Sequence, residues 1–191
     1  IARMLGAAGY RTGFVGKWGV GFDDGMADTL PSLSAGDDPD DPAVDARLRD
    51  HQAALTALIR RTGGFEYAAS AFAGNIGNNY PRKLQHHNIE WITQGALDFI
   101  DEATAYNKPF FVYIAPTTIH GPGHDADLDT DSRYTMGGKR ARPFACHPPR
   151  ATIRERLAKA GLPVDSDHAG MTFYDDMIGA VMAKLHDAGL E

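Results

Sequence analysis

A short apolar run between two prolines places the strongest constraint on the fold of this chain. Residues 110–116, FFVYIAP, show no polar alternation, which is typical of a strand buried on both faces of a sheet. The apolar residues before it recur in steps of three and four, as on one face of a helix: Ile89, Ile92, Ala96, Phe99 and Ala103. Asn88 is a suitable N-cap for that helix, Glu90 suits its positive end, and Pro109 forbids its continuation. A helix that leads directly into a buried strand is typical of α/β proteins.

The same alternation of helix and strand is predicted elsewhere in the chain. We expect helices at residues 1–8, 43–61 and 167–188, and strands at 12–15 and 65–72. The last helix is predicted to bury a stripe made of Met171, Tyr174, Ile178, Val181 and Leu185. Residues 23–43 and 117–149 are expected to be loops, the second of them long enough to carry function. The fold class predicted from these patterns is α/β, with a largely parallel sheet flanked by helices.

Charge and composition exclude several classes of protein. The net charge of −6 argues against a general nucleic-acid-binding protein, and no apolar run approaches the roughly 20 residues of a membrane span. Cys146 is the single cysteine, so an internal disulfide framework is excluded. The chain begins with Ile1 rather than Met. We therefore expect residues 1–191 to be an internal part of a single domain, truncated at both ends.

The charges are unevenly distributed. Acidic residues gather between positions 23 and 50, and basic residues gather between positions 133 and 159: Arg133, Lys139, Arg140, Arg142, Arg150, Arg154, Arg156 and Lys159. Solvated loop or helix faces are the simplest interpretation of both stretches. The alternative for the basic stretch is a local attractor for an anionic substrate.

Two residues are predicted to share one edge of the sheet. Lys17 stands among glycines in VGKWGVGF, two residues past the strand at 12–15, and His120 lies four residues past FFVYIAP. Ligands of open α/β sheets bind beyond the carboxyl ends of the strands. If both strands run parallel, a cation and a titratable imidazole meet there, where they could hold an anionic group and move a proton.

Other motifs fail their tests. A phosphate loop needs a glycine where Arg11 stands and a Ser or Thr where Trp18 stands. The stretch DADLDTD at 125–131 lacks the turn glycine and the terminal glutamate of a calcium loop, so we interpret it as a solvated loop. The spacing of four possible zinc ligands, which are His120, His124, Cys146 and His147, matches no standard pattern. A surface or capping role is expected for His86 and His87, and structural roles for His51 and His186.

Three segments, in the right order, resemble the sulfatase family and together extend over roughly the whole chain. AGYRTGFVGKWGVG resembles the sulfatase segment A-G-Y-x-T-x-x-x-G-K-W-H-x-G. The stretch from HHNIEWITQ to IAPTTIHGP is similar to the sulfatase helix, buried strand and substrate-binding histidine. HAGMTFYDDMIGAVMAKLHDAGLE is similar to the helix that precedes a strand with late metal ligands.

The resemblance implies an alkaline-phosphatase-like α/β fold and hydrolysis of a sulfate ester with calcium and a formylglycine. In that scheme the hydrated aldehyde attacks sulfur, and the hemisulfate collapses to release sulfate. Lys17 matches the lysine that contacts the sulfate and the nucleophile. His120 matches the histidine that binds the sulfate and assists the leaving group. Both are therefore predicted to be catalytic and substrate-binding residues.

The sequence departs from the family pattern at several points. Gly19 replaces the histidine that would orient the nucleophile, which puts full activity in doubt. The nucleophile and the calcium ligands are expected upstream and downstream of these residues, so no metal ligand is assigned within the chain and the fragment alone is expected to be inactive. CHPPR at 146–150 fits C-x-P-x-R literally, but it lies in the wrong order for the family, and Cys146 is interpreted as incidental.

Three functions follow from the resemblance. The first is a sulfatase that acts on a sulfated small molecule or a sulfated glycan. The alternatives are a non-catalytic sulfatase-like protein that binds anionic ligands, which Gly19 favours, and a related phosphoesterase or phosphonate hydrolase. The family implies a periplasmic or extracellular location, whereas these residues do not fix the location, the specific substrate or the oligomeric state.

Overall fold

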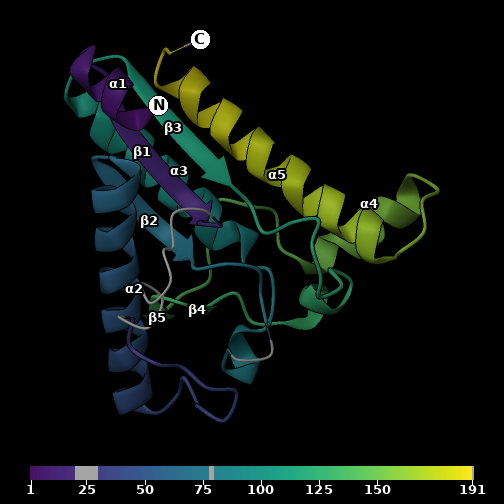
Figure 1. Cartoon of the computed structure of the whole chain (residues 1–191). Helices are drawn as coiled ribbons and strands as arrows, with labels where there is room; N and C mark the ends of the chain where they lie inside the picture. Colours follow the sequence, from purple (N-terminus) through teal and green to yellow (C-terminus); the bar gives the residue numbers. More distant parts are fainter. Residues whose placement is uncertain (20–29, 78–79, 191) are drawn as a thin grey trace.

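The computed structural model describes residues 1–19, 30–77 and 80–190 (Figure 1). Its main helices are α1 (Ala2–Ala7), α2 (Pro42–Gly63), α3 (Ile89–Ala105), α4 (Ala151–Lys159) and α5 (Ser166–Asp187). The strands are β1 (Arg11–Lys17), β2 (Tyr67–Phe72), β3 (Phe110–Ala115), β4 (Tyr134–Thr135) and β5 (Gly138–Lys139). Two short 3-10 helices, η2 (Arg82–Leu84) and η3 (Ala126–Asp129), complete the described elements.

The central sheet has the strand order β2-β1-β3, and both pairings are parallel. β1 is therefore the middle strand, and the carboxyl ends of all three strands point to one edge (Figure 1). Gly16 has a φ of +98°, and a Cβ atom there would lie 2.0 Å from the carbonyl oxygen of Ala115 on β3. Only glycine allows the two strands to approach so closely at the point where β1 ends. The predicted parallel sheet is confirmed.

The helix boundaries follow from local capping. The carboxylate of Asp41 accepts a hydrogen bond from the Ala43 backbone N–H at the start of α2, and Gly64 ends that helix in the left-handed conformation. The side chain of Asn88 accepts from the Trp91 backbone N–H and caps α3, as predicted. The expected helices 1–8, 43–61 and 167–188 and the strands 12–15 and 65–72 are all present with small shifts.

Helices cover both faces of the sheet. Val15 of β1 packs in one core cluster with Ile92 and Ala96 of α3, and α5 packs against the outer side of α3. On the opposite face, Phe14 packs with Leu55 and Ile59 of α2. Alternation along β1 thus sends successive side chains into two cores, which is the expected architecture of a three-layer α/β domain.

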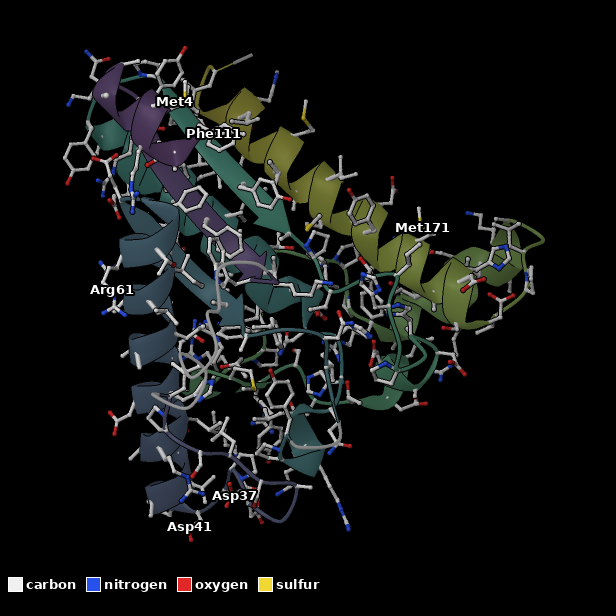
Figure 2. The ribbon with its side chains drawn as sticks, in the orientation of Figure 1. Met4, Asp37, Asp41, Arg61, Phe111 and Met171 are labelled. Atoms are coloured by element: carbon white, nitrogen blue, oxygen red, sulfur yellow. The ribbon has the colours of Figure 1, made fainter. Side chains whose placement is uncertain are left out.

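Two predictions about burial are wrong. β3 was expected to be buried on both faces, but it is an edge strand of the described sheet, and Tyr113 is 53% exposed. The cause is that α2 packs against β2 rather than β3. On α5 the buried apolar side chains are Ala169, Phe173 and Met177. Met171 and Ile178 of the predicted stripe are about half exposed, and Figure 2 labels Met171 on this helix.

The predicted loop 117–149 contains more structure than expected. It holds η3 and the small antiparallel pair β4–β5, and α4 follows it without having been predicted. The guanidinium of Arg150 ties this region down by donating to the Glu90 carboxylate at 2.5 and 2.7 Å and to the Asp127 carbonyl at 3.0 Å. The long segment is therefore held by this buried ion pair and by Leu128 and Met136, which pack in the main core.

Candidate active-site edge

Lys17 is the last residue of β1 rather than two residues beyond the strand, and its ammonium reaches the carboxyl edge of the sheet. Its Nζ donates a hydrogen bond to Oδ1 of Asn75 at 2.8 Å. Asn75 lies three residues beyond the end of β2. The next residue, Trp18, is 7% exposed and its backbone N–H donates to the Phe72 carbonyl at 2.8 Å. The buried indole and the close approach at Gly16 together fix the backbone on both sides of Lys17.

His120 lies five residues beyond the end of β3, on the same edge of the sheet as Lys17. The imidazole is exposed, and the backbone N–H of His120 donates to the carbonyl of the buried Thr117 at 3.3 Å. Among the described side chains, the hydrogen-bond partner of Lys17 is Asn75 and not His120. The structure therefore brings both predicted residues to one edge, with an amide oxygen beside the lysine that the sequence reasoning missed.

Gly19 is not crowded by any residue that the structure describes. A Cβ atom at this position would meet no described atom within 4 Å, and its φ lies outside the left-handed range. Crowding therefore does not explain why the chain has glycine where the sulfatase segment has histidine. The remaining residues of VGKWGVGF, 20–22, lie outside the described part of the chain.

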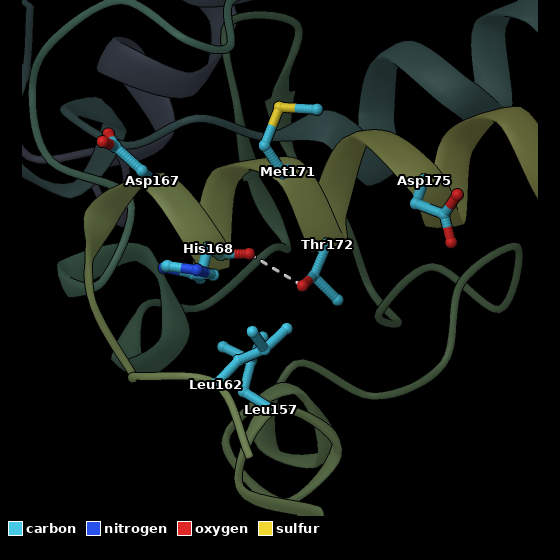
Figure 3. A pocket seen from close by; sticks show the side chains of 7 residues that line it. All are labelled: Leu157, Leu162, Asp167, His168, Met171, Thr172 and Asp175. Carbon is cyan, nitrogen blue, oxygen red and sulfur yellow. Dashed lines mark hydrogen bonds between the residues drawn. The ribbon is translucent and has the colours of Figure 1, made fainter. Parts of the chain in front are cut away.

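Two surface hollows can be compared as possible substrate sites, and only the second of them is lined by Lys17. A hollow of about 410 Å³ lies between α4 and α5, and Figure 3 shows His168 and Thr172 of α5 above Leu157 and Leu162. It also carries Asp167 and Asp175, whose carboxylates repel an anion. Lys17 itself borders an apolar hollow of about 320 Å³ on the face of β1 that carries Phe14. Its lining includes Phe14, Trp18, Phe65, Phe111 and Tyr113.

The basic stretch is largely paired with carboxylates. Arg133, Lys139 and Arg154 contact Asp131, Asp40 and Asp129, and Arg156 contacts Asp176. Three hydrogen bonds, from Lys139, Lys83 and Tyr134, hold the pKa of the Asp40 carboxyl far below its ordinary value. These contacts neutralise much of the positive charge, so they favour a solvated surface over an attractor for anions.

The residues near Cys146 do not form the nucleophile or the zinc site that the sequence reasoning had set aside. The Cys146 thiol donates to the Glu90 carbonyl at 3.4 Å, and burial, with the Glu90 charge, raises its pKa to about 12. His147 is buried, and its Nε2 is 2.7 Å from the Thr93 hydroxyl. Both side chains are thus engaged with α3, which supports the interpretation of Cys146 as incidental.

His86 and His87 are not at the surface, contrary to expectation. Both are buried, and burial is the main cause that lowers the pKa of each to about 4. His87 forms a group with His124 and Asp127, whose possible ligand atoms all lie within 4.8 Å of one another. Calcium prefers six to eight oxygen ligands, so a group with two imidazoles and one carboxylate does not fit that ion.

The stretch 125–131 gives no calcium site either. Asp127 is 1% exposed and faces His124, while Asp129 pairs with Arg154 and Asp131 with Arg133. The prediction of a solvated loop is wrong for Asp127, because this side chain is buried. Burial raises the pKa of its carboxyl.

A family model described as Sulfatase matches residues 1–191. The chain belongs to the sulfatase family. The parallel sheet flanked by helices is consistent with the alkaline-phosphatase-like fold of a sulfatase domain. At the family level, membership supports a hydrolase that acts on sulfated substrates. Comparison with curated proteins gives no match. In the part of the chain that the structure describes, no helix is long and apolar enough to cross a bilayer.

Proposed function

We propose that this sulfatase-family chain supplies the sulfate-binding lysine and the proton-donating histidine for hydrolysis of a sulfate ester. The main support for this proposal is the arrangement at the carboxyl edge of the sheet. There the Lys17 ammonium donates to Asn75 at 2.8 Å, and the loop that carries His120 begins at the same edge. A compact ammonium binds a sulfate oxygen as a point charge. An exposed imidazole can protonate the alcohol oxygen as the S–O bond breaks.

Asn75 has a supporting role in this proposal. Its amide oxygen holds the lysine ammonium at the edge before substrate arrives, which reduces the side-chain freedom lost on binding. The apolar hollow beside Lys17 supports an ester whose alcohol part is aromatic, as in an arylsulfate. The formylglycine and the calcium belong, in this proposal, to segments other than the residues described here, and no step is assigned to them.

The test compares sulfate esters with good and poor leaving groups in the intact protein. We expect His120→Ala to lower kcat/KM by roughly 100-fold or more for an alkyl sulfate and far less for a nitrophenyl sulfate, because a good leaving group needs no proton. Lys17→Ala is expected to lower kcat/KM for both esters by a similar factor. The matched controls are Lys159→Ala and His168→Ala, which remove exposed side chains of α4 and α5. Equal losses for both esters in His120→Ala would contradict the assigned proton transfer.

A second function, a non-catalytic protein that binds sulfated ligands, is favoured by Gly19. Because no described atom lies within 4 Å of a Cβ atom at this position, Gly19→His should be accommodated without loss of stability. A sulfatase that is already active gains little from this change, whereas an inert binder gains turnover only with the histidine in place. Sulfate-ester turnover in the unmodified intact protein would exclude the binder.

A further inference from the structure

Three buried polar side chains behind the loop of His120 have atoms without partners. His87, His124 and Asp127 are 0%, 2% and 1% exposed. Among the described residues, Nδ1 of His87 and Nε2 of His124 have no hydrogen-bond partner, and Nδ1 of His124 and Oδ2 of Asp127 face only each other, at 3.4 Å. Buried polar atoms without partners cost free energy, and clusters of them require a physical reason.

The other polar atoms of the same side chains are already held in place. Nε2 of His87 donates to the Pro122 carbonyl at 3.0 Å, which fixes the tautomer and leaves the lone pair of Nδ1 free. Oδ1 of Asp127 accepts from the His87 backbone N–H at 3.2 Å, which leaves Oδ2 free. Histidines that ligate metals usually donate their second N–H to a carbonyl or a carboxylate in this way.

From this geometry we propose that His87, His124 and Asp127 bind one zinc ion. Nδ1 of His124 and Oδ2 of Asp127 are 3.4 Å apart. Two ligands of a tetrahedral zinc, each about 2.0–2.1 Å from the ion, lie about 3.3–3.4 Å apart. Nitrogen ligands favour zinc over calcium, and the fourth position is open to water.

The surroundings are suited to a dication. The carboxylate of Asp127 is 1% exposed, and a bound cation would offset the cost of burying its charge. The ring centroids of His87 and His124 lie 4.1 Å apart, and the possible ligand atoms of all three side chains lie within 4.8 Å of one another.

The proposed ion joins two segments that are far apart in the sequence. His87 immediately precedes the N-cap of α3, and His124 and Asp127 lie in the loop that carries His120. A zinc ion here stabilises the loop without taking part in the reaction proposed above, and the inference does not depend on that reaction.

The experiment measures the metal content of the intact protein. Zinc is first removed with a chelator that prefers zinc, while calcium is kept in the buffer. After zinc is returned and excess removed, elemental analysis should find one zinc per chain. Asp127→Asn and His124→Gln are expected to lower zinc affinity by at least ~10–100-fold. The matched controls are Asp165→Asn and His168→Gln, an exposed pair with the same spacing along the chain, at 2.7 Å. Their zinc content should equal that of the unmodified protein.

A cobalt measurement keeps the inference testable if a variant fails to fold. Cobalt(II) added to the zinc-free, unmodified protein should give the intense visible absorption of a tetrahedral site, and zinc should abolish it. A protein that binds no zinc and gives no such absorption, or one whose zinc survives in Asp127→Asn and His124→Gln, would overturn the proposal. In that case a proton shared by His124 and Asp127 compensates the buried carboxylate.

Discussion

Removing the Arg150 guanidinium should destabilise the protein more than removing any exposed arginine of the basic stretch. The Arg150 and Glu90 side chains are 8% and 5% exposed, and two parallel hydrogen bonds of 2.5 and 2.7 Å join them. Arg150 also donates to the Asp127 carbonyl and the Thr130 hydroxyl. Arg150→Met preserves the apolar stem but leaves the Glu90 carboxylate buried without a counter-ion.

The expected magnitude follows from that uncompensated charge. Breaking a buried ion pair by removing one partner costs about 3–5 kcal/mol. With a urea m-value of about 2 kcal/mol/M, the unfolding midpoint should fall by ~1.5–2.5 M. Burial alone would raise the pKa of Glu90, but the hydrogen bonds and charge of Arg150 outweigh it and hold the pKa below its ordinary value. The contribution of the pair is therefore present above the ordinary pKa of a glutamate and is lost as the pH falls through the lowered value.

The assay is urea unfolding of the unmodified protein and three variants. Arg154→Met is the control, because its partner Asp129 is 73% exposed and such surface pairs contribute about 0–1 kcal/mol. The double variant Glu90→Leu/Arg150→Met removes both charges and should be more stable than Arg150→Met alone. The reasoning is refuted if Arg150→Met and Arg154→Met shift the midpoint equally, or if the double variant is the least stable of the three.

Three further changes test other parts of the structure. Gly16→Ala should lower the free energy of unfolding by at least ~2 kcal/mol, because the new Cβ atom would clash with the Ala115 carbonyl. The control Gly179→Ala on α5 should not lower it, because no described atom lies within 4 Å of that Cβ position. Burial lowers the pKa of His51, so stability should fall as the pH decreases below the ordinary histidine value. His51→Asn should make this slope less steep in urea titrations between pH 7 and 5, and the buried His86 and His87 should maintain the rest of it. Cys146→Ala should retain full sulfate-ester turnover, since a thiol with a pKa of about 12 is not a nucleophile; abolished turnover with intact folding would contradict this.

Local patterns predicted the elements of the fold because each depends on a few neighbouring residues. Asn88 and Gly64 set helix ends through their own backbone contacts, and the apolar period of α3 specifies the face that packs on the sheet. The edge position of β3 depends instead on which strands surround it, and an apolar run reads the same at an edge and at the centre. The exposed Met171 shows the same limit, since α5 packs through a face shifted toward Phe173.

The candidate site also contains residues that the sequence could predict and residues that it could not. Lys17 and His120 could be found because one ends a recognisable strand and the other follows one, and parallel pairing brings both to one edge. Asn75 follows a strand too, but an asparagine in a loop of glycines and asparagines carries no distinguishing pattern. His87 and Asp127 are 40 residues apart and become neighbours only through the fold, as their 3.2 Å hydrogen bond shows.

The buried polar groups near the candidate active-site edge form one connected network. Arg150 joins the Glu90 carboxylate to the Asp127 carbonyl, and the Asp127 side chain in turn accepts from the backbone of His87. Through these contacts the first turn of α3, the start of α4 and the loop of His120 hold one another in place. Loss of Arg150 should therefore weaken zinc binding at the proposed site as well as stability, whereas loss of zinc leaves the Glu90–Arg150 pair intact. If both effects are observed, the loop is folded by its own contacts and then binds the metal. If loss of zinc also breaks the Glu90–Arg150 pair, the metal is needed to fold the loop.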